Sequence, residues 1–196
     1  MARPRKADQQ GMATEKIESA FWKLLETEDF SEITVLRIAQ ESGVNRNSFY
    51  YHYKDINDLA YQAFMRNADN EVSRALITAL LSSFQRDNTQ PFVFDPAILP
   101  YTKRIMLCAA SGSPFLTRLT HDLLKEVWLN SLQLKENMLS SEEKVQINFI
   151  FAGLVATLGS REIRQFPLTL SALVDSEIGR AMMSTMKKIV SQRMER

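Results

Sequence analysis

The apolar residues of this chain recur every three or four positions, which is the spacing of one face of an α-helix. The clearest stripe lies near the N-terminus and follows the order i, i+3, i+4, i+7 and i+8. No stretch alternates apolar and polar residues for long enough to indicate a strand, and glycine and proline number only six each. The pattern predicts an all-α protein. The first stripe consists of Ile17, Ala20, Phe21, Leu24 and Leu25.

The next apolar positions predict two short helices joined by a tight turn. The hydroxyl of Thr34 can cap the first helix, whose buried side carries Val35, Ile38 and Ala39. Gly43 should end this helix, because glycine tolerates the left-handed backbone conformation. Asn45 should cap the second helix. This layout is typical of a helix-turn-helix unit that reads DNA.

The second helix should have one buried side and one polar, aromatic side. At about 100° of rotation per residue, Phe49 and Tyr53 share the buried side. Arg and Asn side chains can form two hydrogen bonds with a base edge, whereas Tyr, Ser, His and Lys suit phosphate oxygens. The remaining positions are Asn47, Ser48 and Tyr51 on the opposite side, Arg46 and Tyr50 on one edge, His52 on the other, and Lys54 beyond the end.

An ordinary amphipathic helix would also have a polar outer face, so the aromatic residues decide between the two interpretations. Phe49, Tyr50, Tyr51 and Tyr53 lie within five residues, and one helix face can bury only two of them. At least one large ring is therefore exposed beside cations, which favours a contact surface.

This segment resembles the DNA-binding domain of the TetR (tetracycline-repressor) family over about a quarter of the chain. The resemblance implies an N-terminal three-helix domain, residues 1–56, and a larger helical ligand-binding and dimerisation domain, residues 57–196. It implies contacts with or near bases for Arg46, Asn47, Ser48 and Tyr51, and backbone contacts for Thr34, Tyr50, His52 and Lys54. The matching residues are Thr34, Ile38-Ala39, Gly43-Val44, Asn45 to Ser48, Phe49, Tyr50, Tyr51, His52, Tyr53 and Leu59.

One position departs from the family pattern. Members commonly carry a phosphate-contacting lysine where this chain has Ile56, so one anchor is missing unless Lys54 replaces it. This departure leaves open an alternative function, a co-regulator of the same fold that has lost operator binding and acts through ligand or protein contacts.

The charge is low for a DNA-binding protein. Lys and Arg number 24 against 23 Asp and Glu, and residues 1–56 contain eight basic and nine acidic side chains. This balance argues against a protein that coats nucleic acid regardless of sequence. Positive charge is local instead, with Arg37, Arg46 and Lys54 in the reading unit, and Arg37 is therefore a candidate DNA contact like the other two. A basic arm within residues 1–10, with Arg3, Arg5 and Lys6, is either a frayed end or a tail that reaches into a groove of DNA.

The rest of the chain predicts further helices. One long helix should run from residue 57 to about 85 and connect the two domains, followed by helices near 101–111, 114–137, 141–166 and 169–194. Residues 147–158 are apolar on nearly all sides, which indicates burial on more than one side. The resemblance implies that the last two helices pair with those of a second copy; the alternative is a purely intramolecular core. The final stripe is Leu170, Leu173, Val174, Ile178, Ala181, Met182, Met186 and Ile189.

Catalytic and metal-binding patterns are missing from the sequence. Two histidines, His52 and His121, are too few to predict a metal site, and no phosphate loop, nucleophile elbow or Cys-x-x-Cys occurs. We therefore expect neither an enzyme nor a cofactor. The single cysteine, Cys108, fits a buried small side chain in a reducing cytoplasm better than a redox sensor. No apolar run approaches the roughly 18 residues that span a bilayer, and the N-terminus has no apolar leader, so we predict a cytoplasmic protein without a membrane segment.

A small-molecule cavity is expected between the C-terminal helices, and ordinary core packing is the alternative for each residue. The candidates are Met106, Cys108, Phe115, His121 and Trp128. Together these observations predict a homodimeric, sequence-specific transcriptional regulator, a repressor that binds a double-stranded operator and is released by a small-molecule effector.

Overall fold

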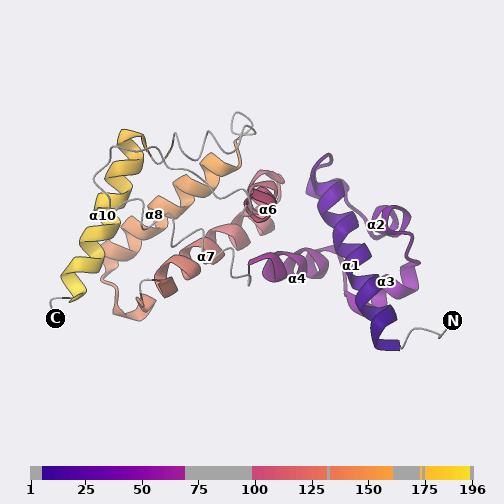
Figure 1. The fold of residues 1–196 in the computed structure, drawn as a ribbon. Helices are drawn as coiled ribbons and strands as arrows, with labels where there is room; N and C mark the ends of the chain where they lie inside the picture. The colour runs from indigo at the N-terminus through magenta and orange to yellow at the C-terminus, as the bar shows by residue number, and fades with distance from the viewer. Residues whose placement is uncertain (1–5, 69–98, 132, 161–172, 174, 195–196) are drawn as a thin grey trace.

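The computed structural model describes residues 6–68, 99–131, 133–160, 173 and 175–194, and every regular element in them is helical. The predicted all-α class is confirmed. Helices α1 to α3 form one group, α7, α8 and α10 form another, and α4 and α6 lie between the two (Figure 1). The helices are α1 (Lys6–Leu25), α2 (Val35–Ser42), α3 (Arg46–His52), α4 (Ile56–Ala68), α6 (Leu99–Ala110), α7 (Pro114–Ser131), α8 (Ser141–Leu158) and α10 (Glu177–Met194), with 3-10 helices η1 (Phe30–Glu32) and η3 (Glu136–Met138).

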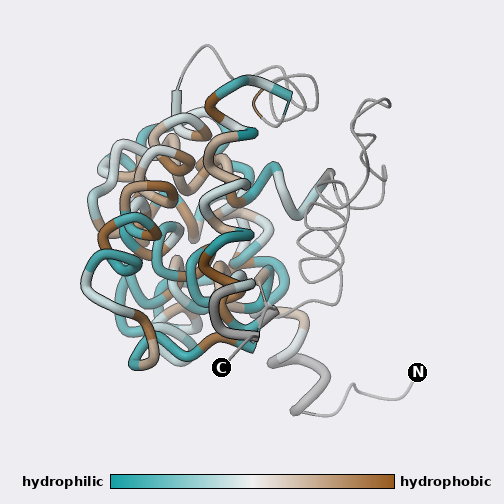
Figure 2. The backbone as a smooth tube through the Cα atoms, turned by 90° about the vertical axis from the view of Figure 1, so that its left-hand side faces the viewer, coloured by the Kyte–Doolittle hydropathy of each residue, from teal (hydrophilic) through white to brown (hydrophobic). Residues whose placement is uncertain are grey.

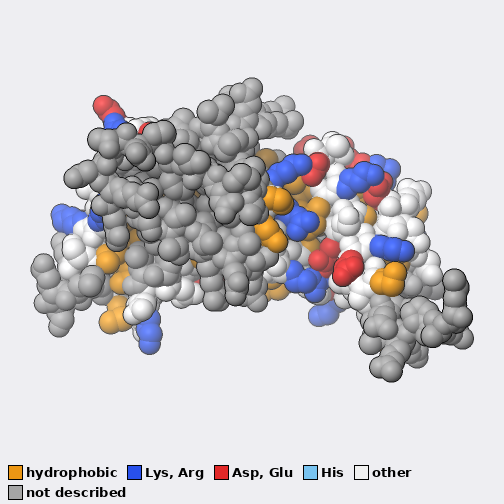
Figure 3. Space-filling view, in the orientation of Figure 1, with side chains coloured by type: hydrophobic (Ala, Val, Ile, Leu, Met, Phe, Trp, Pro, Cys, Tyr) orange, Lys and Arg blue, Asp and Glu red, His pale blue; other side chains and the backbone are white. Residues whose placement is uncertain are grey.

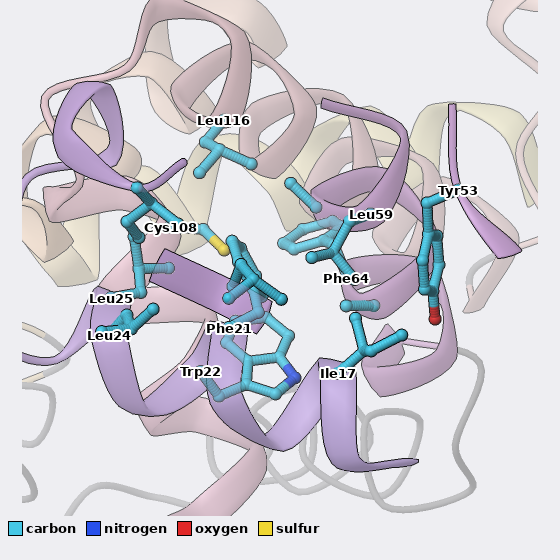
Figure 4. Packing of buried hydrophobic residues seen from close by; sticks show 14 of the residues in the cluster. Ile17, Phe21, Trp22, Leu24, Leu25, Tyr53, Leu59, Phe64, Cys108 and Leu116 are labelled. Carbon is cyan, nitrogen blue, oxygen red and sulfur yellow. The ribbon is translucent and has the colours of Figure 1, made fainter. Parts of the chain in front are cut away.

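The predicted stripe of α1 is the centre of the first apolar core. Ile17 and Phe21 are fully buried, and α2, α3 and α4 each contribute a buried side chain, such as Ile38, Phe49 and Phe64. Figure 4 shows that residues of α6 and α7 join this cluster. The core is therefore continuous across residue 56, and the domain boundary at 56/57 stays a prediction. The residues added from α6 and α7 are Cys108, Leu116 and Leu123.

A second apolar core lies between α7, α8 and α10. Trp128 of α7 packs against Phe151 of α8, with ring centroids 5.9 Å apart, and Ile189 of α10 belongs to the same cluster. Along the helices, hydrophobic stretches alternate with hydrophilic ones, as the amphipathic pattern requires (Figure 2). The second core gives this group of helices a hydrophobic centre of its own.

Several helices end or begin at positions that differ from the predicted ones. Helix α1 begins at Lys6, inside the predicted polar arm, because residues 6–10 contain good helix formers and no glycine or proline. Helix α8 ends at Leu158 instead of residue 166. Its C-cap, Gly159, packs so closely that an added Cβ would lie 2.5 Å from the backbone oxygen of Ala109. The helix therefore stops where its end meets the end of α6.

The last helix begins later than predicted. Helix α10 starts at Glu177, preceded by Ser176, whose hydroxyl accepts a hydrogen bond from the backbone nitrogen of Gly179 at 3.0 Å. A serine at this position satisfies a free amide of the first turn. Of the predicted final stripe, Leu170 and Val174 lie outside the described residues, as does the predicted connector beyond Ala68.

Candidate functional site

The turn between α2 and α3 has the predicted caps. The hydroxyl of Thr34 accepts a hydrogen bond from the backbone nitrogen of Arg37 at 3.3 Å, and the side-chain oxygen of Asn45 accepts one from the backbone nitrogen of Ser48 at 2.8 Å. Between them, Gly43 adopts a φ of 67°, the left-handed conformation that favours glycine. These local interactions fix where α3 begins.

Helix α3 has the predicted buried and exposed sides. Phe49 and Tyr53 are 1% and 2% exposed, and their ring centroids lie 5.6 Å apart in the first core. On the outer side Tyr50 and Tyr51 are 51% and 71% exposed. Arg46 and Asn47 are exposed beside them. The burial of two rings thus holds a seven-residue helix whose other side presents an arginine, an amide and two phenols.

The other predicted contact residues differ in their exposure and in the partners that their side chains already have. The guanidinium of Arg37 forms an ion pair with Glu28, and the hydrogen bond to that carboxylate raises the pKa of Arg37. His52 is half-buried, with Nδ1 3.4 Å from the hydroxyl of Thr14 in α1. Ser48 is half-buried, whereas Thr34 and Lys54 are exposed. Thr34 and His52 therefore support the helices as well as lying near their outer surface.

Cations without an acidic partner are scarce on this domain. Lys23 pairs with Glu41, as Arg37 does with Glu28. Within the described residues, the side chains of Arg46 and Lys54 form no ion pair. Figure 3 shows basic and acidic side chains intermixed over this part of the visible face. Among residues 34–54, the cations without an ion pair therefore lie at or just beyond the two ends of α3, and Lys16 of α1 also forms none.

Ile56 has a structural role at the first position of α4. Its side chain is half-buried and packs against the first core. Beside it, Asp55 accepts a hydrogen bond from the backbone nitrogen of Asp58, and Asp58 accepts one from the backbone nitrogen of Lys54, both at 2.8 Å. The hydrogen bond from the side chain of Gln62 has the largest effect in lowering the pKa of Asp58, and the hydrogen bond from the backbone nitrogen of Lys54 lowers it further. The start of α4 is therefore fixed by caps and packing, while the side chain of Lys54 is left exposed.

A polar network that sequence reasoning missed connects α3 to its neighbours. The hydroxyl of Tyr53 donates to Glu18 of α1 at 2.8 Å and accepts from Arg66 of α4 at 3.0 Å, and Arg66 also pairs with Glu18. Burial has the largest effect in raising the pKa of Tyr53, and the hydrogen bond to Glu18 raises it further. Tyr53 is the C-cap of α3, so the network ties the end of that helix to α1 and α4. Only the position of Tyr53 on the buried side was visible in the sequence.

A second candidate site is an open groove of about 750 Å³ between α7 and α8. Of the five predicted ligand residues, His121 lies in its wall. The sequence signal that was overlooked is the polar face of α7, where positions 117, 121 and 125 follow at intervals of four. The groove is lined by Ala109, Gly112, Pro114, Thr117, Arg118, His121, Asp122, Lys125, Asn148, Ala152, Val155 and Ala156.

The other predicted ligand residues lie elsewhere. Cys108 is in the first core, where burial raises the pKa of its thiol, and Trp128 is in the second core. Met106 is half-buried, and Phe115 is 40% exposed. For Cys108 and Trp128 the positions fit core packing, which was the alternative to a role in ligand binding.

Helix α8 has an exposed apolar side within the single chain. Phe149 is 80% exposed and Val145 is 68% exposed, while Ala152 and Ala156 are exposed one and two turns further along. On α10, Ile178 of the predicted final stripe is 69% exposed. Large exposed apolar side chains that follow one helix face are typical of an interaction surface.

Two classes of site are not found in the described part of the chain. Its helices include none long and apolar enough to cross a membrane. Nor do those residues contain a cluster of three or more His, Cys, Asp or Glu side chains arranged for a metal ion.

Comparisons with known proteins agree with the geometry of the first site. Residues 17–63 match the family model described as bacterial regulatory proteins, tetR family. Two HTH-type transcriptional regulators of Staphylococcus aureus, from strains USA300 and NCTC 8325, are each 36% identical over 55 residues, 28% of this chain and 30% of the relative. The chain thus matches less than a third of the length of these curated relatives. The crystal structure of the TetR family repressor AlkX from Dietzia sp. strain DQ12-45-1b aligns with 90% of this chain and 96% of its own, at 15% identity and a TM-score of 0.45.

Proposed function

We propose that this chain, which belongs to the TetR family of bacterial regulatory proteins through its N-terminal domain, is a homodimeric transcriptional regulator that binds a specific DNA operator. The observation that carries the proposal is the outer side of α3. It presents Arg46, Asn47, Tyr50 and Tyr51 on a helix whose other side is fixed by two buried rings. Such a helix fits the major groove, where arginine and asparagine read base edges.

The distribution of charge supports a sequence-specific reader over a general DNA-coating protein. In the described reading unit Arg37 is paired with Glu28 and Arg46 is assigned to base edges, which leaves Lys54 as the cation for phosphates. Each phosphate contact contributes to the salt-dependent, sequence-independent part of the affinity. A protein with few such contacts therefore binds non-specific DNA weakly. Binding by one copy should therefore be modest, and two copies on one operator would be needed.

The exposed side of α8 supplies a surface for that pairing. Phe149 and Val145 leave apolar area in water in the single chain, and a second copy of α8 would cover it. We propose that the last two helices form the dimer interface. Two reading helices would then meet successive major grooves about 34–36 Å apart.

We further propose that the regulator is a repressor released by a small molecule bound in its C-terminal half. The two halves are connected closely enough for this, since Cys108 and Leu116 share a core with α1. The backbone nitrogen of Phe30, just before α2, donates to the backbone oxygen of Ser111 at 3.2 Å. A ligand that moved the end of α6 would change the support of the reading unit. The proposed role is regulatory and not catalytic.

The test is fluorescence polarisation with DNA from the chain's own promoter region and scrambled DNA of equal length. Replacing Arg46 with Ala should reduce the preference for promoter DNA by roughly tenfold, the effect of about 1.4 kcal/mol at a base contact. Arg37→Ala is the matched control, because Arg37 is already paired with Glu28 and should change affinity less.

The outcomes separate the proposed regulator from its alternative. Equal affinity for both DNAs at moderate salt, with no difference between the two arginine variants, would contradict operator reading. The same result together with a co-purifying partner protein would favour a co-regulator that has lost operator binding. Sedimentation of Phe149→Asp should show loss of the dimer if α8 forms the interface.

A further inference from the structure

We propose that the groove between α7 and α8 binds an amphiphilic organic carboxylate, a compound with one anionic group on a compact apolar body. The inference rests on the proposed ligand-controlled regulator and names the chemistry of its effector. It follows from the different character of the two walls of the groove, one rich in hydrogen-bond donors and the other apolar.

The α7 wall is rich in hydrogen-bond donors. Thr117, His121 and Lys125 follow at intervals of four residues and share one side of the helix. Arg118, whose side chain is 86% exposed, also lines the groove. Across the groove, Asn148 of α8 adds an amide. All five side chains can donate hydrogen bonds, whereas the lining contains one carboxylate.

That carboxylate already has partners on its own helix. Asp122 lies 3.0 Å from Nδ1 of His121 and 3.7 Å from the guanidinium of Arg118. Formally the lining has two cations against one anion when His121 is neutral. A cationic ligand would have to compete with Arg118 for Asp122 and would face Lys125, so the charge balance favours an anion.

Lys125 is the best-placed group to select the charge of the ligand. Its side chain is only 16% exposed, and its ammonium forms an ion pair with Glu136 of η3 at 3.1 Å, whereas the Glu136 side chain is 54% exposed. An ammonium has three donors, so it can bind a ligand carboxylate beside or in place of that exposed partner. Hydrogen bonds between ionised groups are about twice as strong as neutral ones and strengthen when water is excluded.

The α8 wall is apolar and built from small side chains. Ala152, Val155 and Ala156 face the groove, and Ala109 and Gly112 close the end near α6. Small residues leave room for a flat or branched apolar body to lie against the helix. The volume of about 750 Å³ lies in the range of sites that hold drug-sized ligands.

The test is isothermal titration calorimetry of the full chain, without DNA, using 2-naphthoate and its neutral counterpart 2-naphthamide. The two probes share one apolar body and differ in charge. We expect naphthoate to bind about tenfold more tightly, the equivalent of one charge-assisted contact. Lys125→Met should remove that difference and leave naphthamide binding unchanged. Lys135→Met, which replaces an exposed lysine outside the groove, should leave both affinities unchanged.

A second variant tests the location of the site. Ala152→Phe places a large ring on the apolar wall and should weaken both probes without changing the far-ultraviolet circular dichroism. Equal affinities of the two probes, no saturable binding at millimolar concentration, or naphthoate binding unaffected by both Lys125→Met and Ala152→Phe would overturn the proposal. Because DNA is absent, these results are independent of the promoter-binding test, so either proposal can fail alone.

Discussion

The network around Tyr53 makes a strong prediction about how α3 is held. Tyr53→Phe removes one hydroxyl and keeps the buried ring. In the native protein that hydroxyl donates to Glu18 at 2.8 Å and accepts from Arg66 at 3.0 Å. The substitution therefore tests the polar contacts of the C-cap of α3 without creating a large cavity.

The magnitude follows from the partners that remain. A hydrogen bond to a charged group contributes about 1.5–3 kcal/mol. Glu18 and Arg66 still pair with each other after the substitution, and their side chains are 16% and 50% exposed, so water can replace part of the lost interaction. We therefore expect a loss of about 1.5 kcal/mol in the free energy of unfolding.

The pH dependence provides a second measurement. Burial and the hydrogen bond to Glu18 raise the pKa of Tyr53 in the folded protein, whereas the pKa of tyrosine in the unfolded chain is about 10. Above that pH the unfolded state loses a proton that the folded state keeps, so stability decreases as pH rises. The decrease should approach about 1.4 kcal/mol per pH unit, and Tyr53→Phe should lack this contribution.

The assay is urea unfolding at fixed protein concentration at pH 7, 10 and 11. Tyr61→Phe is the matched control, because Tyr61 is 46% exposed on α4 and the same oxygen is lost there. At pH 7 the Tyr53 variant should unfold at lower urea than the control, and by pH 11 the gap between it and the native protein should narrow. Equal stability of the two variants at pH 7, together with a constant gap, would refute the role of the network.

Three further predictions concern backbone positions and caps. Asn45→Ala should cost about 1 kcal/mol of stability by uncapping α3, measured by urea unfolding; an unchanged midpoint would contradict the capping role. Gly43→Ala should destabilise because of its φ of 67°, whereas Gly11→Ala inside α1 should not, since a Cβ there meets nothing within 4 Å; thermal unfolding of the pair distinguishes them. Gly159→Ala should lower the melting temperature because its Cβ would meet a backbone oxygen at 2.5 Å, while Gly153→Ala on the same helix, with open space, should not; equal melting temperatures would disprove the close approach of α8 to α6.

The features that the sequence predicted correctly depend on neighbouring residues. The caps at Thr34 and Asn45, the left-handed Gly43 and the burial of Phe49 and Tyr53 all follow from spacing within one or two helical turns. Such features need only helical geometry and the preferences of individual residues. This is why the outer surface of α3 was predictable before the fold was known.

Features that join distant parts of the chain were not predictable in the same way. Glu18 and Arg66 are separated by 48 residues, and nothing near either residue indicates that they meet at Tyr53. Cys108 was a candidate for the cavity with core packing as the alternative, and it joins the core of α1, because α6 lies between the two helical groups. The sequence likewise indicated only part of the groove. It pointed to His121 on α7 and not to the wall that α8 contributes.

For α8, the sequence pattern indicates which positions are apolar but not what covers them. Residues 147–158 are apolar on nearly all sides, which predicted burial on more than one side, yet one chain buries Ile147, Phe151 and Val155 and leaves Phe149 in water. Burial of such a ring would contribute roughly 1.5–3 kcal/mol, which favours a partner that covers it. The same side of α8 also carries Ala152 and Ala156, which line the groove. If a second copy covers Phe149, it must also approach the groove, so ligand affinity and dimerisation should be thermodynamically linked, each strengthening or weakening the other by the same factor.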